Sequence, residues 1–161
     1  FAFLSPYRVE RIFTFLDPYK DPLGSGYQII QSQIHIGSGR IFGQGWEPHL
    51  LHQYLPQSIS DTIFAVFAQK TGFLGSSLLL LIFFFIFFLG FRIGAKQKNK
   101  FLRLSCQGVS VWLAFQAFFN IGALCGLLPL AGVHLPFMSA GGSAILAEIL
   151  GVAVILNVGR K

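Results

Sequence analysis

The sequence predicts an all-α, multi-pass membrane protein with three transmembrane helices and a large extracytoplasmic loop that carries short interfacial helices. Hydrophobic residues make up 53% of the chain and charged residues only 11%, whereas an ordinary globular domain has roughly 25% charged residues. These few polar side chains cannot cover a water-facing surface, and lipid must therefore form part of the solvent. Two long stretches, 73–91 and 104–147, contain no charged residue, and a membrane span needs about 20 predominantly apolar residues.

Helix breakers divide the apolar stretches into separate spans. The second stretch is interrupted by Gly126, Pro129, Gly132 and Pro136, and Gly and Pro are the strongest local breakers. We therefore predict transmembrane helices over 62–92, 104–128 and 139–158, a connection at 93–103 and a hairpin at 129–138.

Basic residues predict the orientation of these spans. The charges of the 93–103 connection are all positive, and Arg160-Lys161 closes the chain. Because cytoplasmic loops collect Lys and Arg, we expect both segments on the cytoplasmic side, with 1–60 and 129–138 on the outer side. The clustered net charge of +6 then fits a lipid bilayer and no nucleic acid, since no RNA-binding signature accompanies it. The chain opens inside an apolar stretch, so we expect further helices before Phe1.

The outer loop, 1–60, has recognisable segments. Tyr7–Leu16 and Tyr27–Ile36 have apolar residues at helical spacing, and the second is predicted to lie at the membrane interface. The Gly-rich stretch 37–45 has no following Lys-Ser/Thr and no preceding strand, which excludes a P-loop and a dinucleotide fingerprint. It is either a flexible loop or a backbone that approaches a phosphate.

Asp61 lies where the outer loop meets the first predicted span. Ser58-Ile59-Ser60-Asp61 fits a capping box, and a carboxylate near a helix N-terminus is stabilised by the helix dipole. The alternative is a general base at the mouth of a membrane cleft. The spacing leaves both open.

Glu148 and the histidines also have two interpretations each. A carboxyl group near the middle of a span is a functional candidate by default, but Glu148 could instead be hydrogen-bonded to a neighbouring helix. The four histidines invite a metal site, yet no carboxylate stands at ligand spacing. We expect them to be exposed loop residues; they are His35, His49, His52 and His134.

Several motifs occur in a fixed order along nearly the whole chain. They are Pro6-Tyr7-Arg8-Val9-Glu10-Arg11, Phe15-Leu16-Asp17-Pro18, Asp21-Pro22-Leu23-Gly24-Ser25-Gly26-Tyr27-Gln28, Tyr54-Leu55-Pro56 ahead of Asp61, Gly126-Leu127-Leu128-Pro129 and Leu135-Pro136-Phe137-Met138-Ser139-Ala140-Gly141-Gly142-Ser143. In this order they resemble the SEDS family of FtsW, RodA and SpoVE, most of all FtsW. The match corresponds to the last third of a ten-helix protein.

The resemblance implies a peptidoglycan glycosyltransferase of the bacterial cytoplasmic (inner) membrane. Its substrates would be lipid II and an undecaprenyl-pyrophosphate-linked glycan, its protein partner a class B penicillin-binding protein, and its setting cell division. The essential aspartate of the family matches Asp61, so the resemblance favours the general base. We expect substrate binding by Arg8, Arg11, Gln28, Gln31, Ser32, Arg40, Ser139 and Ser143. No cofactor is required by the motifs, although a divalent cation could assist the leaving pyrophosphate.

The chain departs from the family pattern near the aspartate. The family usually has His-Thr before it and Glu-Glu in the following helix, where this chain has Ile59-Ser60 and Gln69-Lys70. Ala140 replaces a usual Tyr. These changes remove titratable neighbours of Asp61. Two other functions therefore remain as alternatives: a flippase or transporter of lipid-linked precursor, with Glu148 on its path, and a non-catalytic scaffold for a penicillin-binding protein.

Overall fold

The computed structural model of the protein describes residues 6–24, 26–46 and 59–160, and every regular element in them is helical. The elements are α1 (Pro6–Leu16), the short 3₁₀ helix η1 (Pro18–Lys20), α2 (Tyr27–Ser38), α3 (Ile59–Ala95), α4 (Lys100–Leu124) and α5 (Gly142–Gly159). The predicted all-α class is confirmed.

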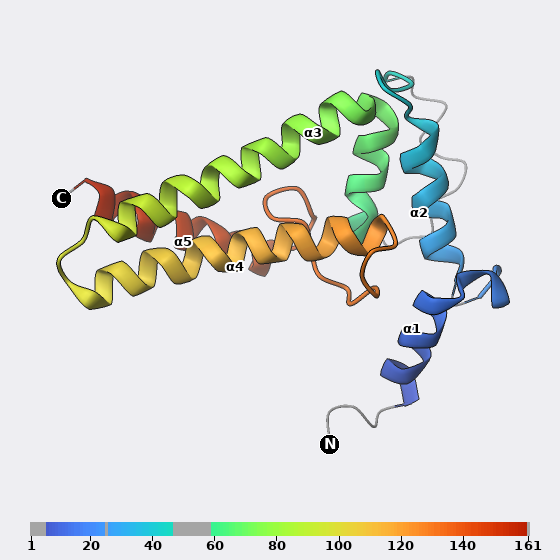
Figure 1. The fold of residues 1–161 in the computed structure, drawn as a ribbon, viewed down its shortest axis with the longest axis horizontal. Helices are drawn as coiled ribbons and strands as arrows, with labels where there is room; N and C mark the ends of the chain where they lie inside the picture. The colour runs from blue at the N-terminus through green and yellow to red at the C-terminus, as the bar shows by residue number, and fades with distance from the viewer. Residues whose placement is uncertain (1–5, 25, 47–58, 161) are drawn as a thin grey trace.

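Three helices are long and apolar enough to cross a membrane: Asp61–Ala95, Lys100–Leu124 and Gly142–Gly159. Figure 1 shows the later part of α3 beside α4, running in opposite directions, with α5 alongside them. Large apolar side chains such as Leu81, Phe84 and Phe118 are exposed on these helices. Exposure of such side chains fits a lipid-facing surface, because lipid tails are as apolar as Leu.

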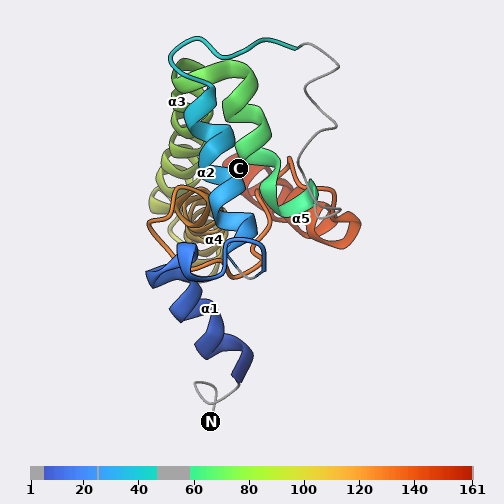
Figure 2. The ribbon, with the colours of Figure 1, turned by 90° about the vertical axis from the view of Figure 1, so that its right-hand side faces the viewer.

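The helix expected to run unbroken across 62–92 is bent at Gly72. This residue has φ 68° and ψ −163°, a backbone region that is essentially restricted to glycine. The part of α3 before the bend turns away from the bundle and lies beside α2, as both views show (Figures 1 and 2). α2 and the first part of α3 thus run across one end of the bundle.

The Gly-rich segment after α2 forms hydrogen bonds with the backbone groups of α3 on both sides of the break at Gly72. Its backbone donates from Gln44 N to Gln69 O at 3.0 Å and from Gly45 N to Lys70 O at 3.2 Å; in return, Arg40 O accepts from Phe73 N at 2.8 Å and Ile41 O from Leu74 N at 3.1 Å. A broken helix leaves such groups without partners, and buried backbone groups must be paired. The segment is therefore a clamp across the break, and its N–H groups at Gln44 and Gly45 are already used.

Side chains join α2 to the first part of α3 near the same bend. His35 Nδ1 lies 2.8 Å from Gln69 Oε1, and Gln69 Nε2 donates to Gln44 Oε1 at 3.1 Å. His35 is buried, so the expectation of an exposed loop histidine was wrong at this position. The reason is that α2 packs directly on α3 and its polar face is covered.

The loop between α4 and α5, residues 125–141, lies at the end of the bundle where α3 begins. Gly126 has φ 77°, and Leu127 N donates to Gly122 O at 2.8 Å, an arrangement typical of a helix ended by a glycine in the left-handed region. Leu135 is buried in the main apolar core with Phe64 of α3 and Leu124 of α4. This packing fixes the loop against the N-terminal part of α3.

Candidate functional site

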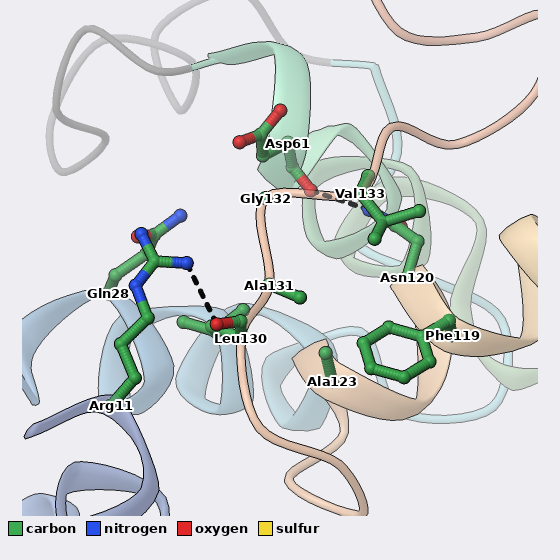
Figure 3. A pocket seen from close by; sticks show the side chains of 10 residues that line it. All are labelled: Arg11, Gln28, Asp61, Phe119, Asn120, Ala123, Leu130, Ala131, Gly132 and Val133. Atoms are coloured by element: carbon green, nitrogen blue, oxygen red, sulfur yellow. Dashed lines mark hydrogen bonds between the residues drawn. The ribbon is translucent and has the colours of Figure 1, made fainter. Parts of the chain in front are cut away.

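A small pocket forms where α1, α2, α3, α4 and the 125–141 loop meet. Its lining residues are Arg11, Gln28, Asp61, Phe119, Asn120, Ala123, Leu130, Ala131, Gly132 and Val133. Figure 3 shows Arg11 and Gln28 together on one side of the pocket and Asp61 across from them. The chain thus brings one carboxylate, one guanidinium and one amide to the same opening, from three different helices.

Arg11 is fixed to the loop that forms one wall of the pocket. Its Nη1 donates to Leu130 O at 2.8 Å, the dashed contact at lower left in Figure 3. Because the guanidinium has five donors in a fixed fork, it can bind Leu130 and still direct other N–H groups elsewhere. A positive charge therefore lies in the same pocket as the Asp61 carboxylate.

Asn120 of α4 ties together the two segments that meet at Asp61. Its side-chain amide donates to Asp61 O at 3.1 Å and to Val133 O at 2.6 Å. Asn120 is buried, and these two bonds replace contacts that the carbonyl oxygens would otherwise make with water. The backbone at Asp61 is consequently held at a fixed position relative to the loop.

The Asp61 carboxylate is paired with a histidine of that loop. Asp61 Oδ1 lies 3.0 Å from His134 Nδ1, and the two side chains are 25% and 40% exposed. Asp61 is in the first turn of α3, as the capping-box pattern predicts, while the Ser58 partner of that box lies outside the described residues. The carboxylate therefore stays partly open to solvent.

Glu148 occupies a different, closed position. Its side chain is 1% exposed; Oε1 accepts from Gln116 Nε2 at 3.2 Å and Oε2 accepts from Phe137 N at 2.8 Å. Phe137 has φ 62°, a conformation that costs a non-glycine residue about 1–3 kcal/mol and persists only where surrounding contacts impose it. Both Glu148 oxygens are engaged in linking α5 to α4 and the 125–141 loop, which favours the structural interpretation.

The whole chain, residues 1–161, matches the model of a family described as "Cell cycle protein" and comprising FtsW, RodA and SpoVE. The chain belongs to the FtsW/RodA/SpoVE family. It is 40% identical over 157 residues to "Stage V sporulation protein E" of Bacillus subtilis (strain 168), which covers 97% of this chain and 43% of that relative. It is 42% identical over 158 residues to "Probable peptidoglycan glycosyltransferase FtsW" of Hydrogenovibrio crunogenus, covering 96% of this chain and 41% of the relative.

A solved structure agrees with these relatives. One chain of the solved structure described as "Structural coordination of polymerization and crosslinking by a peptidoglycan synthase complex" superposes on the present chain with a TM-score of 0.78. The two chains are 32% identical, and the match covers 98% of this chain and 43% of that chain. The present chain therefore spans less than half the length of the FtsW/RodA/SpoVE proteins that it matches here.

Of the residues selected from the sequence of this family member, the structure brings three together. Asp61, Arg11 and Gln28 line the same pocket. Arg8 belongs to α1, but its side chain is not among those the structure describes. These four positions keep their predicted roles as hypotheses.

The other selected residues lie elsewhere. Ser32 is buried and donates to Gln28 O at 2.8 Å. Gln31 and Arg40 do not line the pocket. Arg40 comes just after the C-terminal end of α2, whereas Gln28 is near its N-terminal end. Ser139 Oγ accepts from Leu135 N at 2.8 Å in a buried contact. Ser143 is exposed at the start of α5. Their binding roles stay predictions.

His134 is the residue that sequence reasoning missed in this FtsW/RodA/SpoVE member. The departures at 59–60 and 69–70 remove titratable neighbours that the family pattern places near Asp61, whereas the loop supplies one from far along the chain. A signal was present, because His134 is the only His, Lys, Arg, Asp or Glu in 125–141 and the resemblance places this loop on the same side as Asp61.

The same pair bears on the divalent cation. Within the described part of the chain, no group of three or more His, Cys, Asp or Glu residues could hold a metal ion. Mg²⁺ is usually held by one or two carboxylates together with water and substrate phosphate, and here Asp61 is the carboxylate that the pocket offers. The cation stays a prediction.

Proposed function

We propose that the complete protein is a peptidoglycan glycosyltransferase that polymerises lipid II at the outer face of the bacterial cytoplasmic membrane. The observation that carries this proposal is the partly exposed Asp61 carboxylate in a pocket shared with Arg11 and Gln28, in a chain that belongs to the FtsW/RodA/SpoVE family. Relatives named as probable peptidoglycan glycosyltransferases support the activity. The similarity to those FtsW proteins favours a role in cell division.

In the proposed reaction Asp61 is the general base. The 4-hydroxyl of one disaccharide attacks the anomeric carbon of another that is linked to a lipid pyrophosphate. The new C–O bond forms as the bond from the anomeric carbon to the pyrophosphate oxygen breaks, and that electron pair leaves with the pyrophosphate. The hydroxyl proton passes to the Asp61 carboxylate. One positioned base is sufficient for such an inverting displacement, and it typically contributes about 10²–10⁴-fold to the rate.

Arg11 is the group in the pocket that can stabilise the leaving pyrophosphate. A guanidinium binds phosphate oxygens through paired N–H groups, and Arg11 lines the pocket opposite Asp61 (Figure 3). Gln28 offers an uncharged donor to sugar or phosphate oxygens. The base, Asp61, and the positive charge that would stabilise the leaving pyrophosphate, Arg11, then lie on opposite walls of the pocket, as an in-line displacement requires.

The partner and the orientation belong to the same proposal. A solved structure with the same fold comes from a peptidoglycan synthase complex, which supports a class B penicillin-binding protein as partner. The basic residues of the connection after α3, Lys96, Lys98, Lys100 and Arg103, support a cytoplasmic location for that end of the bundle. The pocket, at the opposite end, then faces outward, where lipid-linked sugars are polymerised.

The test is Asp61→Asn in the full-length protein, reconstituted with its transpeptidase and supplied with lipid II. We expect glycan synthesis to fall by about 10²–10⁴-fold, while the amount of folded protein is unchanged. The matched control is Asp17→Asn, because Asp17 is exposed and does not line the pocket; it should retain full activity. Undiminished polymerisation by Asp61→Asn would contradict the proposal.

A further inference from the structure

We propose that His134 is a positioning residue for Asp61: it holds one carboxylate oxygen so that the other is presented to the substrate hydroxyl. This inference rests on the proposed function of Asp61. His134 belongs to the 125–141 loop, far from Asp61 in the sequence. It is not among the substrate-binding and catalytic residues selected from the sequence. The contact that carries it joins His134 Nδ1 to Asp61 Oδ1 at 3.0 Å.

The chemistry of the pair fixes which atom donates. An ionised carboxylate can only accept hydrogen bonds, so the hydrogen in this contact is on His134 Nδ1. A hydrogen bond to an ionised acceptor is shorter and roughly twice as strong as one between neutral groups. The imidazole therefore restrains Oδ1. The second oxygen, Oδ2, lies near Gly132, another residue that lines the pocket; a Cβ added at Gly132 would be 3.8 Å from it.

The backbone around His134 is anchored on both sides. Val133 O, just before it, accepts from the Asn120 amide at 2.6 Å, and the same amide binds Asp61 O. Leu135, just after it, is buried and its N–H donates to Ser139 Oγ at 2.8 Å. His134 and Asp61 are thus set relative to each other through a shared partner, and this is the kind of support a precise site needs.

The ring itself lies between the starts of two helices. A Cβ added at Gly141, the residue before α5, would be 3.9 Å from His134 Cδ2, while Nδ1 faces the first turn of α3. The His134 side chain is 40% exposed, so its hydrogen bond to Asp61 is the contact that orients the imidazole. A base whose orientation is fixed before the substrate binds avoids the cost of ordering it in the transition state.

The test compares two substitutions in the full-length protein assembled with its transpeptidase, using lipid II as the substrate. His134→Leu removes the donor, and we expect kcat to fall about 10- to 100-fold, the range that a hydrogen bond to a charged group accounts for, with KM little changed. His134→Asn places an amide N–H close to the position of Nδ1, and we expect it to restore most of kcat. Unchanged kcat in His134→Leu would overturn the inference.

A double substitution separates positioning from folding. If His134 acts through Asp61, His134→Leu should cause no further loss in an Asp61→Asn background, whereas a general structural defect would add to it. Additive losses would therefore overturn the inference. If His134→Leu does not accumulate in the membrane, His134→Asn is compared with His134→Gln, whose longer amide cannot occupy the Nδ1 position; equal kcat values would overturn it.

The outcomes also distinguish this inference from the proposed function. Full activity of Asp61→Asn would contradict the role of Asp61 as general base, and both proposals would then fail. A large loss in Asp61→Asn together with an unaffected His134→Leu removes only the role of His134. Leu127→Ala is the control for the loop, since Leu127 is exposed in the same segment and does not line the pocket.

Discussion

The side-chain amide of Asn120 donates a 3.1 Å hydrogen bond to the backbone oxygen of Asp61. The same amide binds Val133 O at 2.6 Å, so one buried side chain of α4 joins the start of α3 to the loop between α4 and α5. This side chain thus holds Asp61, the proposed base, close to the loop that carries His134, and the proposed reaction assigns it no step of its own.

We expect Asn120→Ala to lower both stability and polymerisation. The substitution removes two part-buried hydrogen bonds, each of which contributes about 0.5–1.5 kcal/mol to stability. It also releases Asp61 from the loop, so kcat should fall more than the folded fraction does. Thermal unfolding in detergent and lipid II polymerisation, measured on the same samples, check this.

Asn99→Ala is the matched control for that experiment. Asn99 caps α4 by accepting from Phe101 N at 2.9 Å, at the end of the bundle away from the pocket. Loss of such a cap costs about 1 kcal/mol, and activity per folded molecule should be unchanged. Equal losses of activity per folded molecule in both variants would contradict a specific role for Asn120.

Glu148 provides a second prediction, based on hydrogen bonding and independent of charge. In Glu148→Gln the side-chain carbonyl can still accept from Phe137 N, and the new amide N–H₂ takes the place of Oε1, which faces Gln116 Nε2. A half-turn of the Gln116 amide then presents its Oε1, a buried atom that now has no partner, as the acceptor for this N–H₂. We therefore expect thermal stability and polymerisation close to those of the unmodified protein. Glu148→Leu should lose about 1–3 kcal/mol or more, because Phe137 N and Gln116 Nε2 both lose their acceptor.

This pair of variants also tests the transport alternative. A carboxylate that carries ions or protons along a path cannot be replaced by an amide without loss of transport, whereas a hydrogen-bond acceptor can. Movement of lipid-linked precursor across vesicles should be unaffected in Glu148→Gln. Lost movement with intact polymerisation would contradict the structural interpretation and favour a path through this position.

The helices and part of the pocket follow from local patterns in the sequence. Apolar runs and helical spacing depend on neighbouring residues alone, and they indicated α1, α2 and the three long helices. Arg11, Gln28 and Asp61 were selected from their motifs, and α1, α2 and α3 bring them to one pocket. Nothing in their spacing showed that they meet, because this depends on how the helices pack.

The bend and the His134 contact depend on relationships that no local pattern contains. Gly72 lies in a mostly apolar run, and glycine is common in transmembrane helices, so the residue alone does not predict a break. The accompanying signal was the Gly-rich stretch 37–45. Its role follows only from the folded chain, in which its backbone hydrogen-bonds to the residues on both sides of Gly72. His134 reaches Asp61 because Asn120 and the core contacts of Leu135 place the loop there.

The clamp across the bend gives the last prediction, for Gly43→Ala. Gly43 has φ 82°, and an added Cβ would collide with the backbone oxygen of Lys70. A left-handed conformation alone costs a non-glycine residue roughly 1–2 kcal/mol, and the collision adds to this by displacing the clamp from Gln69 and Lys70. The freed backbone groups then lack partners, and we expect a large fall in thermal stability and in the yield of folded protein.

Gly45→Ala isolates the effect of the collision. Gly45 has φ 86°, but an added Cβ meets nothing within 4 Å, so this variant suffers the backbone strain without the clash. Its loss of stability should stay near 1–2 kcal/mol and be clearly smaller than that of Gly43→Ala. If the two variants unfold at the same temperature, the clamp is not what holds α3 in its bent form, and the position of Asp61 at the start of that helix must depend on other contacts.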